Sequence, residues 1–296
     1  MPAPLLIACA SFLFAVMGLC VKLASAQYGA GEIVLYRALV GMVLMAAWLR
    51  LRGGTWRTPV PSLHFWRSAS GVIALCLWFY AIGGLPLATA MTLNYMSSVW
   101  MALFLIGGAV LVGRAAIDGR LVAAVLAGFA GVALILRPTI DQRQLWHGLA
   151  GLASGMLLAM AYLQVTALGR AGEPEQRVVF YFSVGGVIAG SALTLAGGGP
   201  SAHDARGLAL LLAIGLLASV AQLMMTRAYS IGHTLSNAAL QYLGIVFSFA
   251  FGVGLFDDPV TWSAVSGMAL IVGAGLTATL LGLRGHTPTA ATPTES

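Results

Sequence analysis

The chain has 296 residues, of which 59% are hydrophobic and only 8% are charged, and its formal net charge is +6. A soluble domain carries roughly 25% charged residues, so most of this surface must face something other than water. The basic residues are scattered between apolar runs rather than gathered on one face, which argues against nucleic acid as a partner. The composition therefore indicates a protein embedded in a lipid bilayer.

Apolar runs long enough to cross a membrane recur along the whole chain. A helix needs about 20 mostly apolar residues to span about 30 Å of hydrocarbon. The charge-free run over 68–113 is too long for one span, and Gly83-Gly84-Leu85-Pro86 is predicted to divide it into two. In chain order, the ten predicted spans lie at 3–21, 33–49, two within 68–113, 121–136, 144–169, 178–203, 207–226, 228–256 and 259–283.

The distribution of basic residues predicts the orientation, because short cytoplasmic loops are enriched in Lys and Arg. With a cytoplasmic N-terminus, the inner loops and flanks would hold Arg50, Arg52, Arg57, Arg67, Arg114, Arg120, Arg170, Arg177, Arg227 and Arg284. The outer side would hold Lys22, Arg37, Arg137, Arg143 and Arg206. We therefore expect a multi-pass protein of the bacterial cytoplasmic (inner) membrane with both termini in the cytoplasm.

The two halves of the chain can be laid over each other. Offsets of 143 and then 147 residues align several residues, among them Ser11 with Ser154, Met17 with Met160, Glu32 with Glu175, Asn94 with Gln241, and Tyr95 with Tyr242. Five helices per half is an odd number, so the second half must run opposite to the first, as in many transporters. The predicted fold is an all-α integral membrane protein of ten transmembrane helices. It forms two inverted five-helix repeats over 1–138 and 144–284, followed by a disordered cytoplasmic tail over 285–296.

Several segments at matching spacing resemble a known family. The run from Leu85 to Tyr95 resembles the start of that family's fourth helix, and the run from Ala127 to Pro138 its fifth. Weaker likenesses lie at 18–22, 36–37 and 267–273. The chain thus resembles the EamA type of the drug/metabolite transporter superfamily over about residues 3–283. The resemblance implies a carrier of small solutes, since relatives carry amino acids, nucleosides, flavins, S-adenosylmethionine, metallophores and drugs.

Polar side chains inside the predicted spans are candidates for a substrate site, because polar groups in hydrocarbon are costly. Asn94 and Tyr95 lie about a third of the way into one span, and Gln241 and Tyr242 occupy the matched place in the second half. The amides could hydrogen-bond a polar substrate while the tyrosines wall a pocket. The alternative is that these groups tie helices together.

Further binding candidates are Tyr80, Trp100, Tyr162 and Gln222. Aromatic rings with a polar handle suit a zwitterionic or aromatic solute through stacking and cation–π contact. The alternative for Tyr80 and Trp100 is a place in an interfacial aromatic belt. Trp78 is expected to face lipid.

Three charged residues near the predicted outer ends are candidates for a gate. Lys22, which is the only lysine, could attract a carboxylate or close a gate with Glu32, or it could simply be a solvated helix end. Arg37 is expected to pair structurally with Glu32. No Asp or Glu lies in the middle of a predicted span, so a buried carboxylate relay is not expected, and facilitated diffusion stays open.

The predicted function is secondary transport of a small polar metabolite by alternating access, and the family resemblance favours export of amino acids or related metabolites. Uptake of a vitamin-, nucleoside- or S-adenosylmethionine-like solute is the alternative. A membrane enzyme is disfavoured because the sequence has no HExxH, Gly-x-Ser-x-Gly or CxxC motif. The three cysteines lie in apolar runs, so neither metal nor cofactor is expected. The expected partners are the bilayer and a small-molecule substrate, with the chain a monomer or weak homodimer.

Overall fold

The computed structural model of the protein describes residues 1–111, 119–136, 142–232 and 234–284, and within these ranges it contains helices and no strand. Its helices are α1 (Ala3–Ala24), α2 (Ala30–Leu51), α3 (Pro61–Gly84), α4 (Leu87–Tyr95), α5 (Ser97–Leu111), α6 (Gly119–Leu136), α7 (Gln142–Arg170), α8 (Glu175–Ala196), α9 (Ala205–Ile231), α10 (Thr234–Leu240), α11 (Leu243–Phe256) and α12 (Trp262–Arg284). The predicted tail and the two basic residues Arg114 and Arg137 lie outside the described residues.

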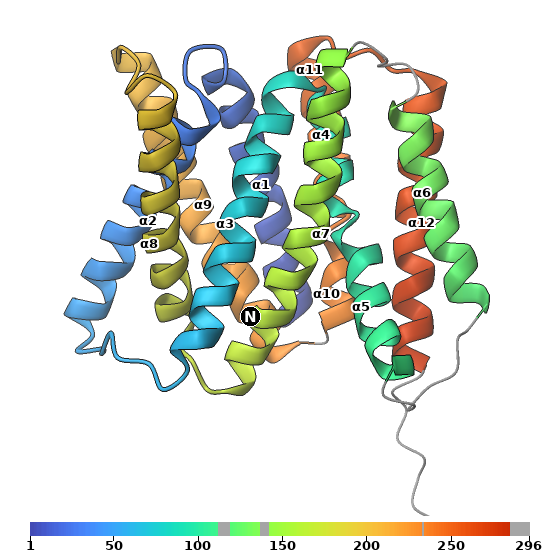
Figure 1. Cartoon of the computed structure of the whole chain (residues 1–296), viewed down its shortest axis with the longest axis horizontal. Helices are drawn as coiled ribbons and strands as arrows, with labels where there is room; N and C mark the ends of the chain where they lie inside the picture. Colours follow the sequence, from blue (N-terminus) through green and yellow to red (C-terminus); the bar gives the residue numbers. More distant parts are fainter. Residues whose placement is uncertain (112–118, 137–141, 233, 285–296) are drawn as a thin grey trace, which may run out of the picture.

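Seven segments of the described chain are long and apolar enough to cross a membrane. They are α1, α2, α3, the stretch Leu87–Gly108 that joins α4 to most of α5, the Gln144–Arg170 part of α7, α8 and α9. The helix α11 and the Trp262–Thr277 part of α12 are apolar but shorter. Figure 1 shows the helices standing side by side, with the N-terminus and the end of α12 at the same end of the bundle. The predicted all-helical membrane architecture is thus confirmed in class, while the number of crossings stays a prediction.

Local sequence signals explain where several helices begin. A proline lies in the first turn of both α1 and α3, where its fixed φ suits a helix and its missing N–H costs nothing. The carboxylate of Asp204 caps α9 by accepting a hydrogen bond of 2.7 Å from the Gly207 amide. At its other end α9 runs past the predicted boundary at residue 226, so Arg227 lies inside the helix and pairs with Glu175 at 2.7 Å.

Two segments predicted as continuous helices are broken. The first break separates α4 from α5 at Met96, and the second separates α10 from α11 at Gln241 and Tyr242. Tight backbone turns cross both places, with the Val99 amide donating to Met96 O and the Gly244 amide to Gln241 O, each at 2.9 Å. The two amide–tyrosine pairs that the sequence matched between the halves therefore both lie at helix breaks.

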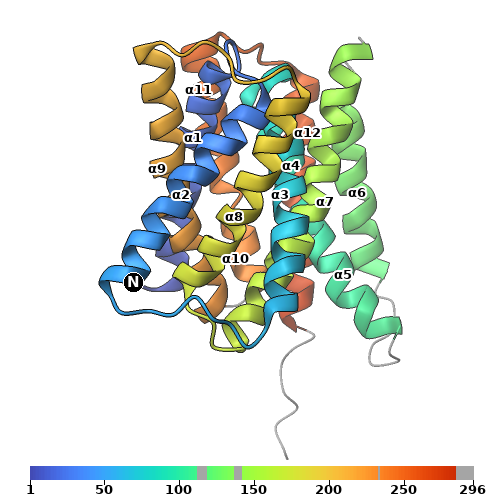
Figure 2. The same cartoon turned by 60° about the vertical axis from the view of Figure 1, so that its left-hand side comes forward.

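The closest packing joins helices from different halves of the chain. The most extensive contacts pair α2 with α8, α3 with α7, α1 with α9 and α6 with α12, and Figure 2 shows α2 beside α8. Glycines permit this approach: a Cβ on Gly190 of α8 would lie 2.6 Å from the Leu35 nitrogen of α2, and one on Gly155 of α7 would lie 2.7 Å from the Leu93 oxygen of α4. Small residues at such contacts are typical of membrane helix pairs.

A polar cluster ties the start of α3 to the connection between α7 and α8. The Glu173 carboxylate lies 3.0 Å from His64 Nε2 and accepts hydrogen bonds from Thr58 Oγ1 at 2.8 Å and Arg177 Nη1 at 3.0 Å. Burial alone would raise the pKa of Glu173, but the hydrogen bonds from His64, Thr58 and Arg177 outweigh it and hold the pKa below its usual range.

Replacing Gly190 by alanine should lower the thermal unfolding temperature of the purified protein. The added Cβ would overlap the α2 backbone at Leu35, and overpacking of this kind costs about 1–3 kcal/mol. Gly254→Ala in α11 is the matched control, because a Cβ there meets no atom within 4 Å, so the variant should be neutral or more stable. An unchanged unfolding temperature for Gly190→Ala would contradict the close contact of α2 with α8.

Stability should depend on the ionisation of Glu173 at acidic pH. Because its pKa is lower in the folded than in the unfolded chain, its contribution is present above the unfolded value of about 4.3 and is lost as pH falls through the folded value. The unfolding temperature of the wild type should therefore fall more steeply below about pH 4 than that of Glu173→Gln, whose side chain does not titrate. Thermal unfolding across pH 7 to 3 measures this, and parallel curves would contradict the assigned cluster.

Candidate functional site: a buried cavity with two arginines

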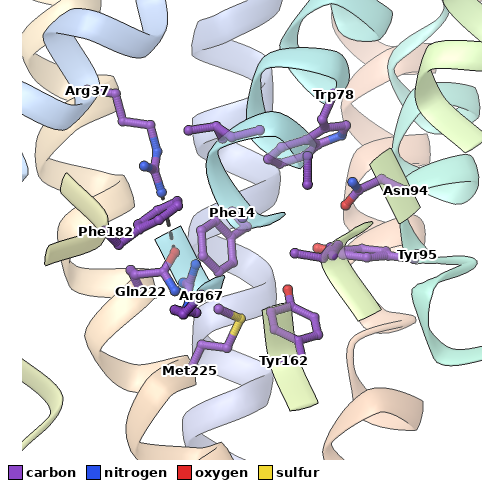
Figure 3. Close-up of a pocket in the computed structure, with 14 residues that line it drawn as sticks. Phe14, Arg37, Arg67, Trp78, Asn94, Tyr95, Tyr162, Phe182, Gln222 and Met225 are labelled. Atoms are coloured by element: carbon purple, nitrogen blue, oxygen red, sulfur yellow. Dashed lines mark hydrogen bonds between the residues drawn. The ribbon is translucent and has the colours of Figure 1, made fainter. Parts of the chain in front are cut away.

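A buried cavity lies among α1, α2, α3, α4, α7, α8 and α9, beside Phe14 near the middle of α1 (Figure 3). The volume open to the centres of water molecules is about 40 Å³. Sites that hold drug-sized ligands enclose roughly 300–1,000 Å³, so this cavity must widen to admit a metabolite. Its wall consists of Phe14, Arg37, Arg67, Gly71, Ala74, Leu75, Trp78, Asn94, Tyr95, Leu158, Tyr162, Phe182, Gln222 and Met225.

One side of the cavity is cationic. Arg37 of α2 and Arg67 of α3 are 5% and 3% exposed, and both guanidinium groups lie against the ring of Phe182, with their central carbons 5.2 and 4.2 Å from its centroid. Arg37 Nη2 donates to Gln222 Oε1 at 3.4 Å, the contact drawn as a dashed line in Figure 3. Arg37 Nε, Arg67 Nε and Arg67 Nη1 are buried without a hydrogen-bond partner.

Neither arginine has an acidic partner among the ion pairs of the described residues. The predicted pairing of Arg37 with Glu32 was wrong, since Glu32 instead lies 3.2 Å from His203 Nε2 and accepts from the Ser201 amide. An arginine at the centre of a membrane helix costs about 2.5–3.5 kcal/mol on insertion scales, whereas a desolvated cation–π contact returns about 2 kcal/mol. One Phe182 ring cannot compensate for two buried guanidinium groups, so this side of the cavity keeps a positive charge.

The other side of the cavity is neutral and polar. Asn94, Tyr95 and Tyr162 lie across the cavity from Arg37, and the Tyr162 hydroxyl points toward the interior in Figure 3. Asn94 Nδ2 donates to Ser154 Oγ of α7 at 2.9 Å, and the Tyr162 ring stacks on Tyr229 at 4.8 Å. Asn94 thus belongs to the wall of the cavity and also links two helices, while substrate binding by its carboxamide stays a prediction.

Of the three predicted binding residues Gln222, Gln241 and Tyr242, only Gln222 lines the cavity. Gln222 lies in the wall, as expected. Gln241 lies behind it, where its Nε2 donates to Tyr229 Oη at 3.1 Å, and Tyr242 packs against Gly275 of α12.

Two of the predicted aromatic residues lie away from the wall. Tyr80 is 44% exposed and stacks on His147 at 4.2 Å, and Trp100 lies beside Phe104 at 6.2 Å between ring centroids. The structure therefore does not bring Tyr80, Trp100, Gln241 or Tyr242 into the cavity wall.

Lys22 binds the end of α3 rather than an acid. Its Nζ donates to Ile82 O at 3.1 Å and to Leu85 O at 2.5 Å, which satisfies carbonyls that the helix end leaves free. The predicted contact of Lys22 with Glu32 is not formed in this conformation.

Sequence reasoning missed Arg67 and Phe182 and misplaced Trp78. Arg67 was predicted on an inner flank because the charge-free window begins at residue 68, but α3 begins at Pro61 and encloses it. A proline at the first helical position is the signal that would have extended this helix. The prediction that Trp78 faces lipid was also wrong, since it is 6% exposed and lines the cavity.

Comparison with known proteins identifies the chain's relatives. The sequence model of the EamA-like transporter family matches residues 1–137. The pseudopaline exporter CntI of Pseudomonas aeruginosa (strain UCBPP-PA14) is 32% identical over 274 residues, which cover 91% of this chain and 93% of that protein. Mouse (Mus musculus) solute carrier family 35 member G1 is 25% identical over 91% of this chain and 76% of its own length.

A solved crystal structure supports the same fold. It aligns with a TM-score of 0.67 at 20% identity and covers 96% of this chain and 99% of its own. The family model and the curated relatives, which align along almost the whole chain, place the protein among multi-pass membrane transporters rather than enzymes. The chain belongs to the EamA-like transporter family of the drug/metabolite transporter superfamily.

Proposed function

We propose that this chain exports a small metabolite across the bacterial cytoplasmic membrane by alternating access, with the buried cavity as the substrate site. The observation that carries the proposal is the cavity itself, because helices from both halves of the chain enclose it and polar side chains point into it. A relative described as a pseudopaline exporter favours outward transport of a metabolite, and it does not favour amino acids over other solutes.

The arrangement of helices supports ten crossings in two inverted repeats. The most extensive contacts join helices across the two halves. The aligned pairs Asn94–Tyr95 and Gln241–Tyr242 lie directly before one helix break and within the other. The family's sequence model ends at residue 137, one residue before the proposed end of the first repeat. In this proposal α4 with α5 forms the fourth crossing, and α10 with α11 forms the ninth. Broken helices at a repeat interface are typical of transporter substrate sites.

Alternating access requires contacts at the two ends of the bundle to open in turn. At one end, the Glu173 cluster joins α3 to the α7–α8 connection. At the other, Lys22 joins α1 to the end of α3, and Glu32 joins α2 to the connection between α8 and α9. With both sets formed, the cavity is narrow, so we propose that the cycle breaks one set at a time.

The proposed orientation places both chain ends and the α2–α3 connection in the cytoplasm. In a variant lacking Cys9, Cys20 and Cys76, a cysteine introduced by Ser201→Cys between α8 and α9 should react in intact cells with a membrane-impermeant maleimide. One introduced by Gly54→Cys should react only after the membrane is permeabilised. Equal labelling of both positions in intact cells would contradict the inverted arrangement.

Export can be tested by comparing the medium of bacteria that express the chain with that of cells carrying an empty vector, using untargeted mass spectrometry. At least one metabolite should be enriched by the wild type. Asn94→Ala should lower its release about tenfold, because losing a carboxamide hydrogen bond to the substrate, worth about 1–1.5 kcal/mol, corresponds to that factor. Gln241→Ala should lower release less, since its side chain lies behind the wall.

The control is Arg50→Gln, which changes an exposed side chain at the end of α2 and should leave release unchanged. All variants should be compared at equal membrane abundance, so that a folding defect is not counted as lost transport. Wild-type medium identical to the vector control would contradict the export proposal. Normal release by Asn94→Ala would contradict the assigned site.

A further inference from the structure

We infer that Arg37 and Arg67 form an anion subsite, which binds a carboxylate or phosphate group of the transported metabolite. The inference deepens the proposed function and rests on it, because it names the class of solute that the cavity accepts. It follows from three properties of the pair: the two side chains are buried, they share one cavity, and they lack an acidic partner among the described residues.

The two guanidinium groups converge on one place from different helices. Arg37 comes from α2 and Arg67 from α3, and both lie over the same ring, Phe182 of α8. Like charges repel, so side chains that could turn elsewhere would not gather here without a compensating interaction. The Phe182 ring supplies part of it, and a bound anion would supply the rest.

Unused donors point to a ligand rather than to a finished structural pair. Arg37 Nε, Arg67 Nε, Arg67 Nη1 and Gln222 Nε2 are all buried without an acceptor. Buried polar groups in folded proteins are almost always hydrogen-bonded, so a set of orphaned donors at one cavity is unusual. Guanidinium donors match the paired oxygens of carboxylate and phosphate groups.

Two acidic residues of the described chain differ from the two arginines in having hydrogen-bonding or charged partners. Glu32 and Glu173 each have partners at the ends of the bundle, away from the arginine pair. A purely structural role for Arg67 would call for a similar arrangement, with a carboxylate or a backbone carbonyl against each donor. The chain provides such an arrangement for Lys22, whose Nζ binds two carbonyl oxygens, but not for Arg67.

The rest of the cavity indicates how such a solute would lie. Its anionic group would face Arg37, Arg67 and Gln222, while the remainder would lie against Asn94 and the aromatic rings of the opposite side. A solute with a negative group at one end and a neutral or amino group at the other fits both surfaces. A solute that is only cationic would meet two unshielded positive charges.

Binding of simple anions to the purified full-length protein tests the subsite directly. At constant ionic strength, citrate, succinate or phosphate should raise the thermal unfolding temperature in a saturable manner, because a ligand that binds only the folded state stabilises it. Neutral succinamide should not. The rise should be absent in Arg67→Gln and Arg37→Gln and present in Arg50→Gln, an exposed arginine at the far end of α2. No rise with any of the three anions, or a full rise in Arg67→Gln, would overturn the inference.

Unfolding temperatures without added anion separate binding from a structural role. Removing an unpaired buried charge should leave the stability of Arg67→Gln unchanged or raise it, whereas removing a structural partner would lower it. A marked loss of stability in both glutamine variants would overturn the inference.

Export of the metabolites enriched by the wild type provides the second test. Each of these compounds should carry a carboxylate or phosphate group, which fragmentation identifies, and accurate mass should separate phosphorus-containing compounds from carboxylates. Arg67→Gln should lower their release at least about tenfold, since truncating one member of a buried charge pair typically costs that much or more. Arg67→Lys should restore part of it, and Arg50→Gln should match the wild type.

The two proposals fail in distinguishable ways. Anion binding without any enriched metabolite would leave the subsite standing and contradict export. Enrichment of only metabolites that lack a carboxylate or phosphate group, with normal release by Arg67→Gln, would leave export standing and overturn the subsite.

Discussion

Hydrocarbon does not solvate charge, and most of this structure follows from that constraint. The helices pair the backbone N–H and C=O groups with one another. The carboxylates of Glu173 and Glu32 lie at the ends of the bundle, where each is close to more than one hydrogen-bond donor. Arg37 and Arg67 are the contrast, since both are buried and neither has an acidic partner in the described chain. The two arginines without an acidic partner line the cavity inside the bundle, and this coincidence is the basis of the proposed anion subsite.

Close helix packing determines how the cavity can change. Gly190 and Gly155 bring α8 and α7 against backbone atoms of neighbouring helices, so these pairs have little freedom to slide. Motion that widens the cavity must therefore move packed helices together as units. The polar contacts at the two ends are better suited to opening, because each joins separate helices through a few hydrogen bonds.

The sequence predicted the class of fold well and the site only in part. A long apolar run can be recognised from the sequence of that segment alone, so the membrane helices could be predicted without knowing which helices pack beside them. Asn94 and Tyr95 were found because a polar residue in a span is costly. Trp78 and Tyr80 show the limit: they lie two positions apart on α3, so they point to different sides, and only the packing of α7 and α8 decides which ring faces inward.

Arg67 was missed for a different physical reason. The predicted third span begins at residue 68, where the charge-free run begins, and so leaves Arg67 outside, although a membrane helix can enclose an arginine beside an aromatic ring and a cavity. The helix breaks were likewise hidden, because neither contains the proline or glycine that usually marks an interruption in an apolar run.

That lack of proline at Met96 and at Gln241–Tyr242 has a mechanical consequence. A proline would delete an amide donor and clash with the preceding turn, which makes a kink permanent. Here each peptide N–H is retained, so the chain can exchange its tight-turn bonds for ordinary helical ones without leaving a donor stranded in lipid. Straightening either joint into a continuous helix would therefore leave every backbone donor with a partner.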